Sequence, residues 1–210
     1  MTPAEVSGTE GYADEAEALF KRYESIPVAD AHRAVLHLIP AAAACILDIG
    51  SGTGRDAAWL AALGHRVVAV EPTDALRLPA MALHPSPLIE WLDDSLPDLA
   101  LLSARGEAFD VVMLTAVWMH LDEAQRRQAM PNVAAMVREG GAVIMKIRHG
   151  PVPATRRMFE VTPEETIELA RMQGLHPVLN ARSESSQAAN RAAGVTWTNL
   201  AFVKGKESAG

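Results

Sequence analysis

The chain has 210 residues, of which 49% are hydrophobic and 21% are charged, and these proportions fit a single globular domain with a sizeable core. Its formal net charge of -7 argues against the broad basic surface that gives proteins non-specific affinity for nucleic acid. The apolar runs are far shorter than the roughly 18 residues of a membrane-spanning helix, and the N-terminus lacks the basic and apolar regions of a secretion signal, so we expect a soluble, cytoplasmic protein without membrane contacts.

The N-terminal part of the chain is predicted to contain two helices. Residues 1–11 are small and polar and include glycine, which predicts a flexible terminus ahead of a single domain over residues 12–203. Apolar residues at helical spacing predict helices over Ala13–Ser25 and Ala31–Leu38. Residues 204–210 are charged and are predicted to form a flexible tail.

A glycine-rich turn follows the first predicted strand. Ala44–Ile49 is a short apolar run that suits a buried parallel strand, and Asp56–Leu63 repeats apolar residues at helical spacing. Gly50, Gly52 and Gly54 therefore lie on a strand-to-helix turn. Glycine accepts positive φ and lets the backbone approach a ligand closely, and the free N–H groups of the following helix favour a polar, partly anionic ligand group.

The spacing of these glycines distinguishes between cofactors. The dinucleotide fingerprint is G-x-G-x-x-G, whereas here Arg55 stands at its third glycine position, which disfavours a pyrophosphate ligand. Asp48, two residues before Gly50, would repel a pyrophosphate but can pair with an ammonium group. The turn therefore predicts a cofactor that carries an amino acid.

Strands and helices alternate through the rest of the chain, which predicts a doubly wound, mostly parallel α/β sheet with its ligand at the carboxyl ends of the strands. The predicted strands are His65–Val70, Phe109–Thr115 and Ala142–Ile147, followed by Leu175–Ala181 and Thr196–Val203. The predicted helices are Thr73–Leu83, Leu99–Ala104, Asp122–Arg138 and Pro163–Gln173. Because only a short helix, Ser186–Ala193, fits between the last two strands, we expect these strands to pair antiparallel.

At Asp48-Ile49-Gly50-Ser51-Gly52-Thr53-Gly54 the chain resembles motif I of the class I S-adenosylmethionine-dependent methyltransferases. The resemblance extends over Ala44–Ile147, because Glu71 ends the second strand, Trp91–Pro97 contains two acids, and Ala116–Leu121 follows the fourth strand. It implies a Rossmann-like fold, a seven-stranded sheet with an antiparallel edge strand, and S-adenosyl-L-methionine as cofactor, with S-adenosyl-L-homocysteine as product.

The resemblance also implies a set of cofactor contacts. Glu71 is expected to bind both ribose hydroxyls, because an ionised carboxylate accepts two hydrogen bonds. The adenine amino group is expected to donate to an acid after the third strand, and the offset from Pro97 favours Asp93 over the adjacent Asp94. The complete expected set is Asp48, Gly50, Gly52, Gly54, Glu71, Pro72, Asp93, Asp94, Thr115 and Trp118.

The catalytic candidates follow strands four and five. Methyl transfer from a sulfonium is an in-line displacement, so a base helps only with a protonated acceptor, and His120 and His149 are the candidates. The alternative role for His120 is a hydrogen bond to the adjacent loop that fixes the segment around Trp118. The histidines and the single cysteine do not cluster with acids as metal ligands do, so no metal is expected.

The acceptor side combines arginines with residues of the N-terminal helices. Arg148–Phe159 carries three arginines, which suit a carboxylate or phosphate on the acceptor, with pairing to surface acids as the alternative. Residues 12–43 resemble the lid helices of the family, whose side chains either contact ligand or pack on the core. The candidate substrate-binding residues are Tyr12, Tyr23, Trp118, Arg148, His149 and Arg156.

Three classes of function remain open. The leading interpretation is a methyltransferase for a small-molecule, possibly anionic, acceptor. The second is an RNA or protein methyltransferase, and the third is a non-catalytic module that binds S-adenosylmethionine or a nucleotide-dependent reductase. Cytosine C5 methylation is excluded, because it requires a cysteine nucleophile after strand four and Cys45 lies in strand one. Adenine, cytosine and glutamine amino-methylation is also disfavoured, because Thr115–Trp118 replaces the Asn/Asp-Pro-Pro-aromatic turn of those enzymes. The sequence specifies no oligomeric state.

Overall fold

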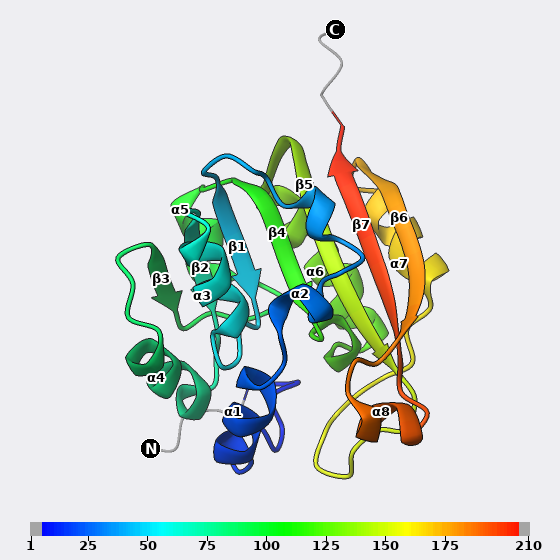
Figure 1. Ribbon diagram of the computed structural model, residues 1–210. Helices are drawn as coiled ribbons and strands as arrows, with labels where there is room; N and C mark the ends of the chain where they lie inside the picture. The colour runs from blue at the N-terminus through cyan, green and yellow to red at the C-terminus, as the bar shows by residue number, and fades with distance from the viewer. Residues whose placement is uncertain (1–5, 206–210) are drawn as a thin grey trace, which may run out of the picture.

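The computed structural model describes residues 6–205, and the outer parts of both predicted flexible termini, residues 1–5 and 206–210, lie outside the described residues. Seven strands form one sheet in the order β3-β2-β1-β4-β5-β7-β6 (Figure 1). The strands are β1 (Cys45–Ile49), β2 (Arg66–Val70), β3 (Ile89–Leu92), β4 (Phe109–Thr115), β5 (Val137–His149), β6 (Leu175–Glu184) and β7 (Thr196–Lys204).

Five of these strands run parallel to one another. Strands β1 to β5 pair in parallel, whereas β7 pairs antiparallel with both β5 and β6. The prediction of a seven-stranded, mostly parallel sheet with antiparallel pairing at its edge is confirmed, and the antiparallel strand β7 lies between β5 and the edge strand β6.

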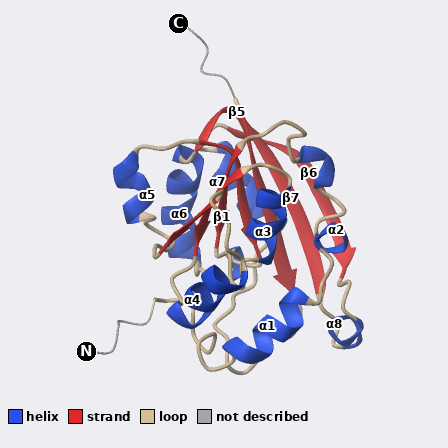
Figure 2. Cartoon of the chain, turned by 60° about the vertical axis from the view of Figure 1, so that its left-hand side comes forward, coloured by secondary structure: helices blue, strands red, loops and turns tan. Residues whose placement is uncertain are grey.

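Helices cover both faces of the sheet (Figure 2). They are α1 (Ala16–Glu24), α2 (Val28–Ala31), α3 (Arg55–Ala62), α4 (Asp74–Leu83), α5 (Ala100–Arg105), α6 (Glu123–Ala135), α7 (Pro163–Arg171) and α8 (Ala188–Ala192), with 3-10 turns η1 (Leu36–Leu38) and η2 (Trp118–His120). One face packs on α3 through residues such as Leu60, and the other packs on α5, α6 and α7 through residues such as Leu102, Val133 and Leu169. Apolar burial on both faces explains why β1 and β2 read as continuous apolar runs.

Two predicted elements differ from the structure. The helix predicted over Ala31–Leu38 is interrupted, because the chain turns inward there: His32 forms a buried hydrogen bond of 2.6 Å to Asp56, and Val35 enters the core beside α3. The helix predicted over Asp122–Arg138 ends at Ala135, since Val137 already pairs with Phe109 of β4. Strand β5 therefore begins five residues before the predicted Ala142.

The carboxyl ends of β1 and β4 point toward α1 and α8, which lie beyond that end of the sheet in Figure 1. Residues 6–12 run across the same end as two turns, with hydrogen bonds from Thr9 N to Val6 O (3.0 Å) and from Tyr12 N to Thr9 O (3.1 Å). Within residues 6–205, no helix has both the length and the apolar character that a bilayer crossing requires. The fold therefore gathers the ends of the five parallel strands beneath an N-terminal cover.

Candidate active site

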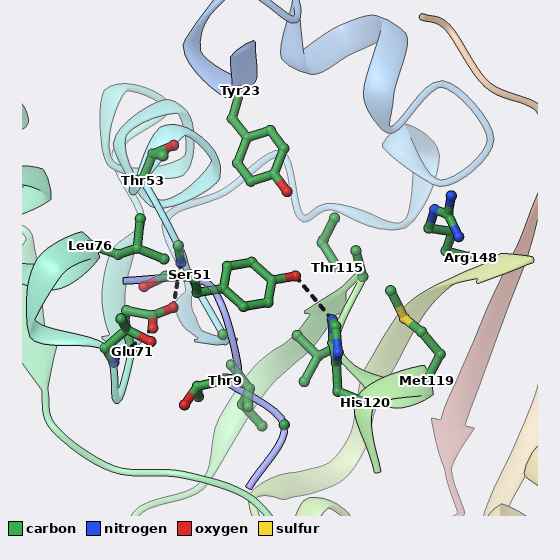
Figure 3. Close-up of a pocket in the computed structure, with 18 of the residues that line it drawn as sticks. Thr9, Tyr23, Ser51, Thr53, Glu71, Leu76, Thr115, Met119, His120 and Arg148 are labelled. Carbon is green, nitrogen blue, oxygen red and sulfur yellow. Dashed lines mark hydrogen bonds between the residues drawn. The ribbon is translucent and has the colours of Figure 1, made fainter. Parts of the chain in front are cut away.

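A cavity of about 310 Å³ lies at the carboxyl ends of the parallel strands. Figure 3 shows Ser51 and Glu71 on one side of it and Met119, His120 and Arg148 on the other, with Tyr23 reaching over the space between them. The predicted residues that line it are Tyr12, Tyr23, Asp48, Gly50, Gly52, Glu71, Pro72, Asp94, Thr115, His120, Arg148 and Arg156. Gly54, Asp93, Trp118 and His149 do not line it.

The glycine turn is shaped by what lies against it. Gly50 has φ 71°, and a Cβ atom built on it would lie 2.4 Å from Val117 Cγ2. Gly54, at φ 82°, stands at the start of α3 against the Trp91 ring, which explains why it supports the cavity without lining it. The amides of Gly50 and Ser51 both donate to Val70 O, at 2.8 and 2.9 Å, and so hold the turn against the end of β2. The turn is therefore a rigid wall.

Asp48 lies beneath this turn with its charge uncompensated. Its side chain is 1% exposed, and its Oδ2 has no hydrogen-bond partner among residues 6–205; the same is true of Ser51 Oγ. Burial raises the pKa of Asp48 well above its usual range, and the negative charge of Asp56 adds to the effect. A buried, unpaired carboxylate facing a cavity suits a ligand that brings a cationic donor.

Glu71 is the acid at the end of β2. Its carboxylate accepts hydrogen bonds from Gly52 N and Thr73 N, each at 2.9 Å. Burial raises the pKa of Glu71, although these two amide bonds and Arg77 act in the opposite direction. Each carboxylate oxygen keeps a second lone pair, so Glu71 can hold the glycine turn and still accept from a ligand.

The two acids after β3 have different roles. The Asp93 side chain is 64% exposed and pairs with Arg77 at 3.1 Å outside the cavity, which corrects the preference for this residue. Asp94 is buried and lines the cavity, and its Oδ2 accepts from Leu101 N and Leu102 N at 3.0 Å. The geometry therefore favours Asp94 as the acid of this segment.

The segment after β4 turns sharply into the cavity. Ala116 takes φ 61°, a left-handed conformation that is strained for a residue with a Cβ atom. The following turn buries Trp118 completely in the core cluster that includes residues of β4 and α6 and leaves it out of the cavity lining, so the geometry does not support its assignment to either site. His120, two residues on, lines the cavity instead.

His120 is held by two hydrogen bonds. Its Nδ1 lies 2.7 Å from the carbonyl oxygen of Arg157, and its Nε2 lies 3.0 Å from the hydroxyl of Tyr12. Burial lowers the pKa of His120, while the bond to the Arg157 carbonyl acts in the opposite direction. The predicted loop contact is present, and the ring also reaches the cavity.

The residues after β5 separate into two groups. His149 lies on the opposite side of the strand from the cavity, where Nε2 is 2.8 Å from Thr198 Oγ1, and this placement corrects its assignment as a base or acceptor contact. Arg156 lines the cavity but is paired with Glu15 at 2.8 Å and lies over the Tyr12 ring at 4.0 Å. Arg148 also lines the cavity, and no carboxylate within residues 6–205 lies within salt-bridge distance of it.

Sequence reasoning missed several cavity residues, among them Lys146 and Trp197. Lys146 shares a strand face with Arg148, since side chains alternate along β5, and its Nζ lies 5.0 Å from the centre of the Trp197 ring. Burial lowers the pKa of Lys146 to about 8. Trp197 itself pairs with Arg148 across β5 and β7. The lysine inside an apolar strand was the available signal, whereas the position of Trp197 depends on the register of β7.

Of the residues that the structure describes, no group of three or more His, Cys, Asp or Glu side chains is placed to hold an ion.

Comparisons with known proteins agree with this geometry. Residues 47–145 match the family model described as a methyltransferase domain. A methyltransferase of Bacillus pumilus is 27% identical over 136 residues, covering 64% of this chain and 57% of that protein. One from Mycobacterium bovis is 35% identical over 111 residues, covering 50% and 40%. The chain thus matches only about half the length of these curated relatives.

A solved structure resembles nearly the whole chain. The Burkholderia thailandensis 1,6-didemethyltoxoflavin-N1-methyltransferase, with bound 1,6-didemethyltoxoflavin and S-adenosylhomocysteine, has a TM-score of 0.68 at 22% identity, covering 98% of this chain and 94% of that one. At that identity the likeness concerns the fold.

Proposed function

We propose that the protein transfers a methyl group from S-adenosylmethionine to a small, anionic acceptor, because residues 47–145 match a methyltransferase-domain model and the fold resembles that of a solved methyltransferase. When bound, the cofactor supplies an electrophilic methyl group on a sulfonium. The protein's contribution is to position both reactants in line and to exclude water.

The observation that carries this proposal is the unpaired Asp48 carboxylate at the cavity wall. S-adenosylmethionine brings an ammonium group, which would compensate the buried charge of Asp48. Glu71 would accept hydrogen bonds from the ribose hydroxyls, and Asp94 would accept one from the adenine amino group. Asp48, Glu71 and Asp94 line the same cavity, so their carboxylates suit the ammonium, ribose and adenine groups of one cofactor molecule.

The acceptor side supports a small anion. Arg148 is a partly buried guanidinium without a carboxylate partner within residues 6–205, and Lys146 lies beside it on the same strand face. The Trp197 ring lines the same end of the cavity and offers a flat apolar surface. The Burkholderia enzyme of similar fold holds a small molecule, 1,6-didemethyltoxoflavin, together with S-adenosylhomocysteine.

The RNA or protein alternative has less support. Its basic surface would draw on six arginines, and five of them form salt bridges with acids of this chain; the pairs are Arg126 with Glu165, Arg127 with Glu123, Arg138 with Asp110, Arg156 with Glu15, and Arg157 with Asp122. Paired arginines contribute little net positive potential to a binding surface. Arg148 alone remains, and it faces the cavity.

The proposal is tested with purified protein and methyl-labelled S-adenosylmethionine. Cell extract is divided by molecular size and by sensitivity to nuclease and protease, and we expect label in a small-molecule fraction that resists both treatments. Label in RNA or in protein would show that the acceptor is a macromolecule of that class and not a small molecule. Tight S-adenosylhomocysteine binding without label in any fraction would instead favour the non-catalytic module, and binding of NAD without either sulfur cofactor would contradict the cofactor assignment.

A further inference from the structure

Three segments that are distant in sequence meet at His120. Residues 6–12 supply Tyr12, whose ring meets the His120 ring edge-on with centroids 5.5 Å apart. The loop after β5 supplies the Arg157 carbonyl on the other side of the imidazole. Figure 3 marks the bond between the tyrosine hydroxyl and His120 with a dashed line at the cavity wall. Neither contact follows from local secondary structure.

The Arg157 carbonyl determines which ring nitrogen of His120 carries the proton. A carbonyl oxygen only accepts hydrogen bonds, so at 2.7 Å His120 Nδ1 must be the donor. In the neutral imidazole Nε2 then has a free lone pair, and the Tyr12 hydroxyl, 3.0 Å away, must donate to it. His120 therefore presents a proton acceptor to Tyr12.

Tyr12 remains a neutral phenol in this setting. Burial, followed by the neighbouring Tyr23, raises the pKa of Tyr12, and Arg156 above its ring acts in the opposite direction without cancelling this rise. Its hydroxyl oxygen donates one proton to His120 and keeps lone pairs for an accepted hydrogen bond. Tyr12 lines the same cavity as Arg148 and Met119, so an acceptor molecule in that cavity can reach the oxygen.

We propose that Tyr12 and His120 form a proton relay, in which Tyr12 touches the acceptor and His120 receives the proton. The inference rests on the proposed methyltransferase function. As the acceptor heteroatom attacks the methyl carbon, its bond to hydrogen breaks and the proton passes to Tyr12 Oη, while the former Tyr12 proton passes to His120 Nε2. The new bond joins the heteroatom to the methyl carbon, and the electron pair of the broken carbon–sulfur bond stays on sulfur.

The charges around His120 suit a transient cation. The imidazolium keeps its Nδ1–H bond to the Arg157 carbonyl, and Glu10 favours the charged ring. Arg148 and Arg156 disfavour it, so the proton leaves readily after each turnover. The Arg157 guanidinium donates to Asp122 at 2.9 Å, to Gln125 at 3.0 Å and to the backbone carbonyl of His120 at 3.5 Å. His120 is therefore neutral before the reaction and only briefly charged.

Kinetics on the labelled small-molecule fraction test the relay. We expect Tyr12→Phe and His120→Gln each to lower the initial rate of label transfer at neutral pH by about 100-fold or more. The double variant should be hardly slower than either single variant, since both interrupt one route. The deficit should shrink as pH rises and the acceptor loses its proton to solvent, a dependence that a purely structural role would not produce. His37→Gln, at an exposed histidine, serves as the matched control and should keep the wild-type rate.

Two further measurements separate the relay from folding and from the proposed function. S-adenosylhomocysteine binding within about threefold of wild type shows that a variant is folded. In nitrogen-15 NMR of the S-adenosylhomocysteine complex, His120 should carry its proton on Nδ1, and Tyr12→Phe should raise its pKa because the neutral ring loses a donor. A proton on Nε2, or the same rate deficit at every pH, would overturn the relay. Failure of the wild-type protein to label any fraction would contradict the proposed function instead.

Discussion

Replacing Asp48 by Asn should stabilise the free protein while weakening its hold on the cofactor. The two side chains have nearly the same shape, so no cavity forms, and the substitution removes only the buried charge whose Oδ2 has no partner within residues 6–205. Asn still leaves a buried polar atom without a partner, but it removes the ionisation that burial opposes, so the free energy of unfolding at pH 7 should rise by up to about 1.4 kcal/mol for each pH unit between the unfolded-state and folded-state pKa values of Asp48. For a domain of this size each kcal/mol raises Tm by about 3 °C.

The same substitution should reduce cofactor affinity. A hydrogen bond to a charged group contributes about 1.5 to 3 kcal/mol, which corresponds to a loss of about 10-fold to 150-fold in the binding of S-adenosylhomocysteine. Calorimetric titration measures this loss, and thermal unfolding without ligand measures the gain. Asp30→Asn, at an exposed acid paired with Arg33, controls for loss of surface charge.

The pH dependence gives the sharpest check. The folded-state pKa of Asp48 is raised, so its contribution to stability is fully present below the unfolded-state value and is lost as pH rises through the folded value. The pKa of Asp56 is lowered, because its contacts with His32 and Arg55 outweigh the opposing effect of burial, and since Asp56 also repels Asp48 the difference between wild type and Asp48→Asn reports on the interacting pair. That difference should grow in favour of the variant as pH increases. A variant that is less stable at all pH values and binds S-adenosylhomocysteine normally would refute the reasoning.

Three other substitutions test the cavity wall. Glu71 accepts hydrogen bonds from two backbone amides, and Glu71→Gln leaves only one acceptor oxygen for them. S-adenosylhomocysteine binding measured by calorimetry should therefore weaken about 10-fold to 100-fold. Normal affinity in a folded variant would contradict this. Gly54→Ala should lose more unfolding free energy in urea than the control Gly106→Ala, because both glycines have positive φ but only Gly54 would bring a Cβ atom within 2.4 Å of Trp91; equal losses would show that the ring yields. Lys146→Met should raise the free energy of unfolding at pH 7 by up to about 3 kcal/mol, because the folded-state pKa of about 8 lies below the ordinary 10.5 and charging the buried amine is costly. Wild-type stability relative to this variant should recover between pH 8 and pH 10.5 in urea titrations, and a constant difference would exclude the buried charge as its cause.

The cofactor side of the site can be predicted from short segments of the sequence. The apolar run of β1, the acid at Asp48 and the alternating glycines all belong to one strand-turn-helix unit, so their relative positions depend on a few neighbouring dihedral angles. Glu71 follows in the same way from the end of β2, because parallel strands bring their carboxyl ends to one edge. Periodicity and turn chemistry are sufficient for such features.

The acceptor side depended on contacts between distant segments. Trp118 lies in the core cluster with residues of β4 and α6 and does not line the cavity, and Asp93 pairs with Arg77 outside it. Sequence spacing predicted the same role for Arg148 and Arg156. In the structure, Glu15, the residue before α1, pairs with Arg156, whereas Arg148 has no carboxylate partner within residues 6–205. A side chain's charge state and orientation depend on partners that chain folding brings within a few ångströms, and those partners are not encoded by nearby residues.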